Sequence, residues 1–245
     1  MTFLSFQYNN RLFLSCLLFV IGYITNAQQE ETGSTQEILL IGDTGYSPAY
    51  GKSIGLQALQ QYIRQNDTKD VHLVFLGDNI YPKGMPDEND KMRPDAEQRM
   101  DHQIDIIKEF EGKVTFIPGN HDYYGGGIPA VERQEEYIDD NFDQKDDWLP
   151  EPGCAIDGKE IGDNVYLVTV DSQWFLEDWD DHPQLNKGCH ELQTREEFFI
   201  ELGTEIKKNQ NKTVIAAMHH PLYSNGTHGG KFPLRSHLFP SSKSI

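Results

Sequence analysis

The feature that most constrains the fold of this chain is a series of short, nearly continuous apolar runs. The runs are rich in β-branched residues, which is typical of strands buried on both faces. Between and after them lie segments whose apolar residues recur at helical spacing. The alternation predicts an α/β domain in which helices cover a parallel or mixed sheet. The predicted strands are 38–41, 71–76, 114–117, 165–170 and 214–218, and the predicted helices are 54–64, 94–111, 129–142 and 194–208.

The composition excludes several classes of protein. A chain of 245 residues with 37% hydrophobic residues is long enough for one well-cored domain or two small ones. Its 39 acidic and 21 basic side chains give a net charge of −18, and no basic run is present. Because nucleic-acid affinity comes largely from clustered Lys and Arg, we expect no nucleic-acid partner. Residues 28–245 hold no predicted membrane span.

The first 27 residues have the pattern of a secretion signal. Arg11 closes a polar segment, an apolar run covers 12–24, and small residues precede Gln28. We therefore expect residues 1–27 to be removed and residues 28–245 to be exported as a secreted, periplasmic or cell-envelope domain. A retained membrane anchor is the alternative, but 13 apolar positions are fewer than the roughly twenty that a spanning helix needs.

Cysteine usage also bears on the compartment. Cys16 lies within the apolar run and would leave with the signal, so Cys154 and Cys189 remain. In an exported chain, two cysteines more often pair than stay free, which favours a disulfide between them. Two free, buried cysteines are the alternative. A cysteine metal site is not expected, because neither residue has a second cysteine within ligand spacing.

Polar residues of a particular kind follow four of the apolar runs. Asp43 stands in the sequence GDTG, Asp78 in GDNIY, Asn120 in GNHD and His219 in HHP. Loops at the carboxyl ends of strands in layered α/β folds converge on one crevice, so these side chains can meet. Carboxylates that gather beside imidazoles repel one another unless cations lie between them. The pattern therefore predicts a centre that binds iron, zinc or manganese.

These motifs resemble those of the calcineurin-like metallophosphoesterases. The family signature runs GDxG, GDxx(Y), GNH(D/E), a histidine after an apolar strand, and GHxH. The first four blocks are present in that order and cover residues 38 to 228. The resemblance implies a layered sandwich of β-sheets flanked by helices. Tyr81, in GDxxY, is similar to the tyrosine that binds ferric iron in the purple acid phosphatase branch.

The resemblance also implies a ligand set for two metal ions. Asp43, Asp78 and Tyr81 would bind Fe(III). Asp78 would also bridge to a divalent Fe, Zn or Mn ion that is held by Asn120 and His219. Taken singly, each residue has an ordinary structural explanation, such as an Asx turn at Asp43 or a helix cap at Asn120. The metal interpretation depends on their joint occurrence at strand ends.

Residues that act on the substrate follow from the same resemblance. His121 would contact the phosphate and donate a proton to the leaving alkoxide, with Asn120 also near the substrate. His228 is similar to a histidine placed near the substrate, although it also fits a solvated loop position. Attack on phosphorus would come from a metal-bound hydroxide. Asp171, after the run 165–170, either lines this site or caps a helix at the strand end.

The sequence analysis leads to an exported binuclear phosphatase that hydrolyses phosphate monoesters of small molecules or phosphoproteins. A phosphodiesterase is one alternative. Another is a non-catalytic metallophosphoesterase-fold module of a larger envelope protein, because fold alone does not guarantee chemistry. The GHxH block is absent, which predicts either a degenerate site or a longer protein. We favour the longer protein and expect residues 28–245 alone to be an incomplete, weakly active or inactive domain.

Overall fold

The computed structural model describes residues 36–48, 51–144, 147–177, 192 and 194–223, all within one compact unit, Gln36–Ile245. The predicted signal segment 1–27 lies outside the described residues, so it stays a prediction. Within the described ranges, the helices are too short or too polar for any of them to cross a membrane.

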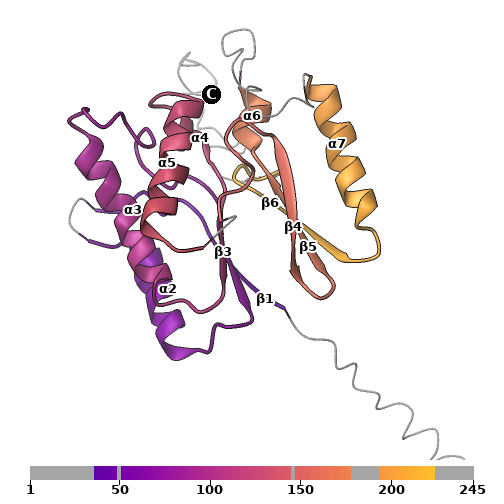
Figure 1. Ribbon diagram of the computed structural model, residues 1–245, viewed down its shortest axis with the longest axis horizontal. Helices are drawn as coiled ribbons and strands as arrows, with labels where there is room; N and C mark the ends of the chain where they lie inside the picture. Colours follow the sequence, from indigo (N-terminus) through magenta and orange to yellow (C-terminus); the bar gives the residue numbers. More distant parts are fainter. Residues whose placement is uncertain (1–35, 49–50, 145–146, 178–191, 193, 224–245) are drawn as a thin grey trace, which may run out of the picture. The chain divides into compact units, whose positions relative to one another are not determined.

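Two three-stranded sheets form the centre of this unit (Figure 1). The first sheet is fully parallel, and its register places Leu39 opposite Leu73 and Leu73 opposite Val114. In the second sheet the first pair is antiparallel and the second pair is parallel. The strand order is β1(Glu37–Ile41)-β2(Val71–Phe75)-β3(Lys113–Phe116) in one sheet and β4(Ile156–Gly162)-β5(Val165–Val170)-β6(Thr213–Met218) in the other. The predicted α/β class with parallel and mixed sheets is confirmed.

Helices flank the two sheets, with α2, α3 and α5 beside the first sheet and α7 beside the second (Figure 1). Their starts follow local chemistry: the Ser53 hydroxyl accepts from the Leu56 amide, and Thr194 forms a capping box with Glu197. Prolines stand in the first turns of α3 and α5. The helices are α2(Ile54–Gln65), α3(Arg93–Ile107), α4(Asn120–Tyr123), α5(Ile128–Asn141), α6(Ser172–Leu176) and α7(Arg195–Lys208).

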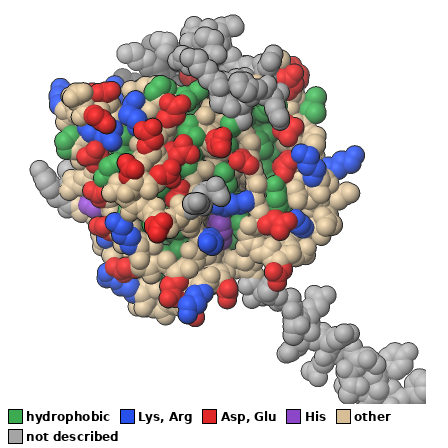
Figure 2. Space-filling model, in the orientation of Figure 1, with side chains coloured by type: hydrophobic (Ala, Val, Ile, Leu, Met, Phe, Trp, Pro, Cys, Tyr) green, Lys and Arg blue, Asp and Glu red, His purple; other side chains and the backbone are tan. Residues whose placement is uncertain are grey.

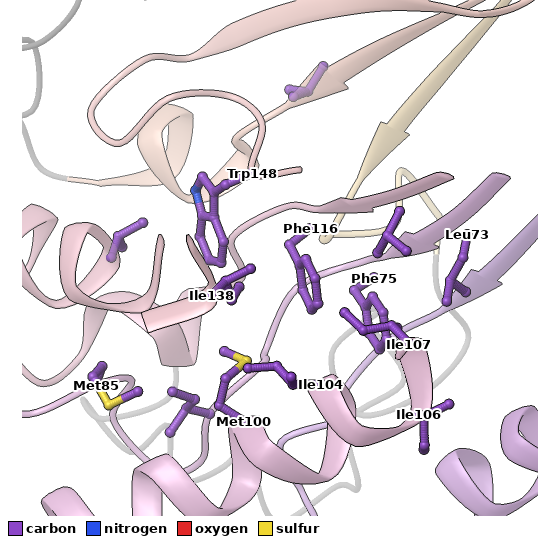
Figure 3. Close-up of a cluster of buried hydrophobic side chains, with 14 of the residues drawn as sticks. Leu73, Phe75, Met85, Met100, Ile104, Ile106, Ile107, Phe116, Ile138 and Trp148 are labelled. Atoms are coloured by element: carbon purple, nitrogen blue, oxygen red, sulfur yellow. The ribbon is translucent and has the colours of Figure 1, made fainter. Parts of the chain in front are cut away.

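The main core lies between the first sheet and its helices. Because side chains alternate along a strand, Leu73 and Phe75 of β2 face this layer, where Ile104 of α3 also lies (Figure 3). Phe75 stacks on Phe116 with ring centroids 4.3 Å apart. A smaller cluster, formed by Val74, Leu167 and Ala217, joins the two sheets on the opposite face of β2. The structure is therefore layered as helix, sheet, sheet, helix.

The acidic stretch from Asp143 to Gly153, which also holds prolines and a tryptophan, predicts a surface loop, but the structure buries part of it. Trp148 is only 2% exposed and stacks beyond Phe116 at a centroid distance of 6.3 Å. The Phe116 amide donates to the Asp147 carbonyl at 2.6 Å, and the Leu149 amide donates to the Phe116 carbonyl at 2.9 Å. Burial of the large apolar indole of Trp148 stabilises this position, although acidic residues stand next to it in the sequence. Residues 147–149 thereby extend the edge of the first sheet beyond β3.

The prediction that every strand is buried on both faces is also wrong. All residues of β2 are buried, but Leu40 of β1 is 58% exposed and β6 has one buried residue, Ala217. The reason is position, since β2 lies between two strands whereas β1 and β6 each pair with one strand among the described residues.

The predicted disulfide is tested only in part. Cys154 is buried and disulfide-bonded. Cys189 lies outside the described residues, so the identity of the partner of Cys154 stays a prediction. The acidic stretch 178–190, whose composition predicts a second surface loop, also lies outside the described residues.

Candidate metal centre

The loops that follow β1, β2, β3 and β6 meet at one end of the two sheets. The Asp43 amide donates to the Gly77 carbonyl at 3.1 Å, and the Gly45 amide donates to the Asp78 carbonyl at 3.0 Å. His219 Nδ1 lies 2.8 Å from the Leu76 carbonyl oxygen. The predicted convergence of strand-end loops is therefore seen, and it includes a loop from each sheet.

Glycines make this close approach possible. A Cβ atom on Gly45 would lie 2.5 Å from the backbone carbon of Asn79. A Cβ atom on Gly119 would lie 2.4 Å from Asp78 Oδ1. Both positions exclude any side chain, because such distances are far below van der Waals contact. The second glycine of GDTG, Gly45, and the glycine of GNHD, Gly119, are thus explained by packing of one loop on the next.

The two aspartates that follow β1 and β2 share an uncommon backbone conformation. Asp43 has φ 55° and Asp78 has φ 56°, in the left-handed region. Non-glycine residues rarely adopt this conformation. Those that do cluster at functional sites, where the surrounding contacts hold them in place. The conformation turns both carboxylates out of the strand direction and towards the hydroxyl of Tyr81.

Tyr81 joins these two carboxylates. Its hydroxyl oxygen lies 2.7 Å from Asp43 Oδ1 and 2.6 Å from Asp78 Oδ2. One phenolic proton serves only one of these contacts, so the other brings two acceptor oxygens together. Burial, followed by the two carboxylates, raises the pKa of Tyr81. A tyrosinate here requires a cation, and three converging oxygens are a suitable set for a hard metal ion.

A second group of acceptors surrounds His219. Because a carbonyl only accepts, His219 Nδ1 donates to Leu76, and Nε2 lies 3.1 Å from Asn120 Oδ1. The Asn120 amide nitrogen donates to the Tyr124 hydroxyl at 2.6 Å, which fixes the amide orientation. Asp78 Oδ1 lies 3.4 Å from the same Nε2 atom. A nitrogen and two oxygens thus converge here, and together they form a donor set that suits a divalent cation.

His121 lies beside both groups. Its amide donates to Asp78 Oδ1 at 2.9 Å, and its Nδ1 atom donates to the Pro82 carbonyl at 2.8 Å. The ring lies against Tyr81, with centroids 4.1 Å apart. The Nδ1 contact leaves Nε2 as the nitrogen that is available for proton transfer to a ligand.

Asp122 holds two loops of the candidate site together, a role that its sequence motif did not predict. Its fully buried carboxylate accepts from the amides of Gly119, Asn79 and Ile80 at 2.8, 2.9 and 3.1 Å. Burial raises the pKa of Asp122 to about 7, and the negative charge of Asp78 adds to this effect. The carboxylate ties the loop after β3 to the loop after β2. The sequence signal that could have indicated this role is the position of Asp122 directly after GNH and directly before Tyr123.

Two further predicted positions have different outcomes. Asp171 is the N-cap of α6, accepting from the Trp174 amide at 3.0 Å and from the Tyr123 hydroxyl. It is therefore a helix cap, one of the two roles that the sequence allowed. His228 lies outside the described residues. Next to His219, the His220 ring nitrogen Nδ1 lies 2.8 Å from the Ser172 hydroxyl.

The donor set is mixed in chemistry. Across the described residues, His, Cys, Asp and Glu side chains do not gather in groups of three that could hold a metal ion. The two acceptor groups at this site instead combine carboxylate, phenol, amide and imidazole donors around Asp78. The residues present fit two cations that share Asp78, with further ligands needed to complete each coordination sphere.

The family model for calcineurin-like phosphoesterases matches residues 37–242. No curated protein sequence matches the chain significantly. Among solved structures, the chain is similar to "GAP50 the anchor in the inner membrane complex of Plasmodium", at 14% identity and a TM-score of 0.44. That match covers 83% of this chain and 60% of the solved chain, so this chain spans about three fifths of that protein's length.

Proposed function

The chain belongs to the calcineurin-like phosphoesterase family, and from this premise we propose that it is a binuclear metal-dependent phosphatase acting on phosphate monoesters. The observation that carries the proposal is the convergence of carboxylate, phenol, amide and imidazole groups around Asp78. Such an arrangement is stable when cations occupy the spaces between the acceptors.

We assign one cation to each acceptor group. Asp43, Asp78 and Tyr81 would hold Fe(III), and Asp78, Asn120 and His219 would hold a divalent Fe, Zn or Mn ion. Tyr81 supports the purple acid phosphatase branch, because a phenolate oxygen is a hard donor suited to ferric iron. Bound cations would supply activation of water near neutral pH and neutralise charge on the phosphate.

The residues of the chain divide the remaining work. His121 holds a proton at Nε2 and transfers it to the departing alkoxide oxygen. The Pro82 carbonyl accepts from Nδ1, so it fixes the orientation of the ring. The Asn120 amide, held by Tyr124, lies next to the phosphate position. Export of the domain is part of the proposal and is supported by the signal pattern of residues 1–27 and by the disulfide at Cys154.

The experiment measures metal content and hydrolysis of an aryl phosphate by the full-length protein. We expect two metal ions per chain and turnover in the wild type, and loss of both metals and of turnover in Asp78→Ala. The control is Asp67→Ala, which removes an exposed carboxylate that accepts from the nearby Lys69 amide. Asp67 precedes β2, whereas Asp78 follows the other end of this strand. The control should keep both metals and full turnover.

Two results would contradict the proposal. A wild-type protein that is metal-free and inert supports the non-catalytic module instead. Turnover that is much faster for phosphate diesters than for monoesters supports the phosphodiesterase.

A further inference from the structure

A polar residue lies on the apolar face of α3. Gln103 has no exposed surface and shares its helix face with Met100, Ile104 and Ile107. Burying an amide costs free energy unless each of its polar atoms has a partner. The partners of Gln103 therefore explain why a glutamine occupies this position.

The carboxamide of Gln103 bridges two loops of the candidate metal centre. Its Oε1 atom accepts from the Thr44 hydroxyl at 2.8 Å, and its Nε2 atom donates to the Asn79 carbonyl at 2.8 Å. Thr44 directly follows Asp43, and Asn79 directly follows Asp78. One side chain thus contacts the neighbour of each aspartate that has a left-handed backbone conformation.

The bridge requires an amide rather than a carboxylate. The Asn79 carbonyl only accepts, so the atom facing it must be a donor, whereas a glutamate would place a second acceptor there. Both loop partners are themselves buried, Thr44 at 2% and Asn79 at 0% exposed. Neither can replace the lost contact with bulk water.

Arg99 strengthens the connection one helical turn before Gln103. Its Nη1 atom donates to the carbonyls of Gly45 and Ser47, both at 2.7 Å, while its Nε atom pairs with Asp95 at 3.0 Å. Helix α3 therefore holds the loop after β1 through two side chains. Of these two, Gln103 also reaches the loop after β2.

We propose that Gln103 is a positioning residue that fixes the separation of Asp43 and Asp78. Without Gln103, the two loops remain joined by main-chain hydrogen bonds. However, Thr44 and Asn79, the neighbours of the two aspartates with positive φ, would no longer be held to one rigid helix. The expected effect of Gln103 on metal affinity rests on the proposed function. Its expected effect on the rigidity of the two loops is independent of that function.

The experiment compares Gln103→Leu with Ile107→Ala in the full-length protein. Ile107 is fully buried on the same helix, and its truncation destabilises the core without touching the two loops. Amide hydrogen exchange of Asp43 and Gly45 is measured in metal-free protein, because both amides donate across the two loops. Zn²⁺ affinity is then measured by titration of the same proteins.

We expect Gln103→Leu to speed exchange of these two amides by about ten-fold and to weaken Zn²⁺ binding by about ten-fold, as loss of a buried hydrogen bond implies. Ile107→Ala should lower the thermal midpoint of unfolding about as much as Gln103→Leu does. It should leave the amide exchange rates and the Zn²⁺ affinity near those of the wild type. Equal effects of the two variants would overturn the inference. If the wild-type protein binds no Zn²⁺, the exchange comparison alone decides whether Gln103 positions the two loops.

A second pair of variants covers the case in which Gln103→Leu does not fold. Thr44→Val removes the hydroxyl that Gln103 accepts from, while Thr44→Ser retains it. We expect faster exchange at Asp43 and Gly45 in Thr44→Val and wild-type exchange in Thr44→Ser. Identical exchange in the two variants would overturn the inference as well.

Discussion

A buried histidine in the first sheet gives a pH dependence of stability whose sign and size follow from the structure. His72 of β2 is 2% exposed, and its Nε2 atom lies 2.8 Å from the Thr115 hydroxyl on β3. Burial lowers the pKa of His72 to about 4, and the positive charges of Lys159 and Lys113 contribute in the same direction. The folded protein therefore holds this ring neutral. We use His72→Gln to remove the titrating group.

The magnitude follows from linkage between protonation and folding. In the unfolded chain the ring has a pKa of 6.5, so between pH 6.5 and about 4 the unfolded state binds more protons than the folded state. The stability that depends on a neutral ring is fully present above pH 6.5 and is lost as the pH falls towards 4. The total is roughly 3 kcal/mol, of which about 2–3 kcal/mol is lost by about pH 4.5.

The assay is urea unfolding of both proteins between about pH 7.5 and about pH 4.5, followed by fluorescence of the buried Trp148 and Trp174. The wild type alone does not isolate the effect, because burial raises the pKa of Asp171 and of Glu135 to about 7 and these carboxyls favour the folded state as the pH falls. The quantity of interest is the difference between the two proteins. A difference that is independent of pH to within about 0.5 kcal/mol would refute the reasoning.

Three further predictions concern the site and the disulfide. His121→Ala should lower turnover by about 10²–10⁴-fold for esters with poor leaving groups and by much less for good ones; equal losses would exclude the acid role. Iron-loaded wild type should show a visible charge-transfer band that Tyr81→Phe abolishes while iron stays bound, and a colourless iron-loaded wild type would remove the purple acid phosphatase branch. Peptide mapping without reductant should find Cys154 linked to Cys189, and two alkylatable thiols would contradict the pairing.

The elements with strong periodicity were the predictable part of the fold. All five predicted strands and all four predicted helices occur, with ends within a few residues of those expected. Strand β4 was missed because its centre reads Gly158-Lys159-Glu160, a polar sequence that suits an edge strand as well as a turn. The burial of Trp148 was missed because it depends on Phe116, which is more than 30 residues earlier, and local composition carries no information about that contact.

The site was predictable at the level of residue types but not of contacts. Strand-end motifs place Asp43, Asp78, Asn120 and His219 in one region, and the structure brings these residues together. The sequence did not indicate what holds them there. The signal for Gln103 was present, as a polar residue among the apolar positions of α3, but its partners become visible only when α3 is packed against two loops.

The contact between His219 and Leu76 has a consequence for the biogenesis of the protein. These residues are 143 positions apart, and they belong to different sheets. Contacts of such long sequence separation form late, because the chain between them must be ordered first. A nascent chain that has folded only its first sheet would hold Asp43, Asp78, Tyr81 and Asn120 but would lack His219. The proposed hydrolytic activity would therefore begin only after the second sheet docks, and a chain in which only the first sheet has folded would be inert towards phosphoesters.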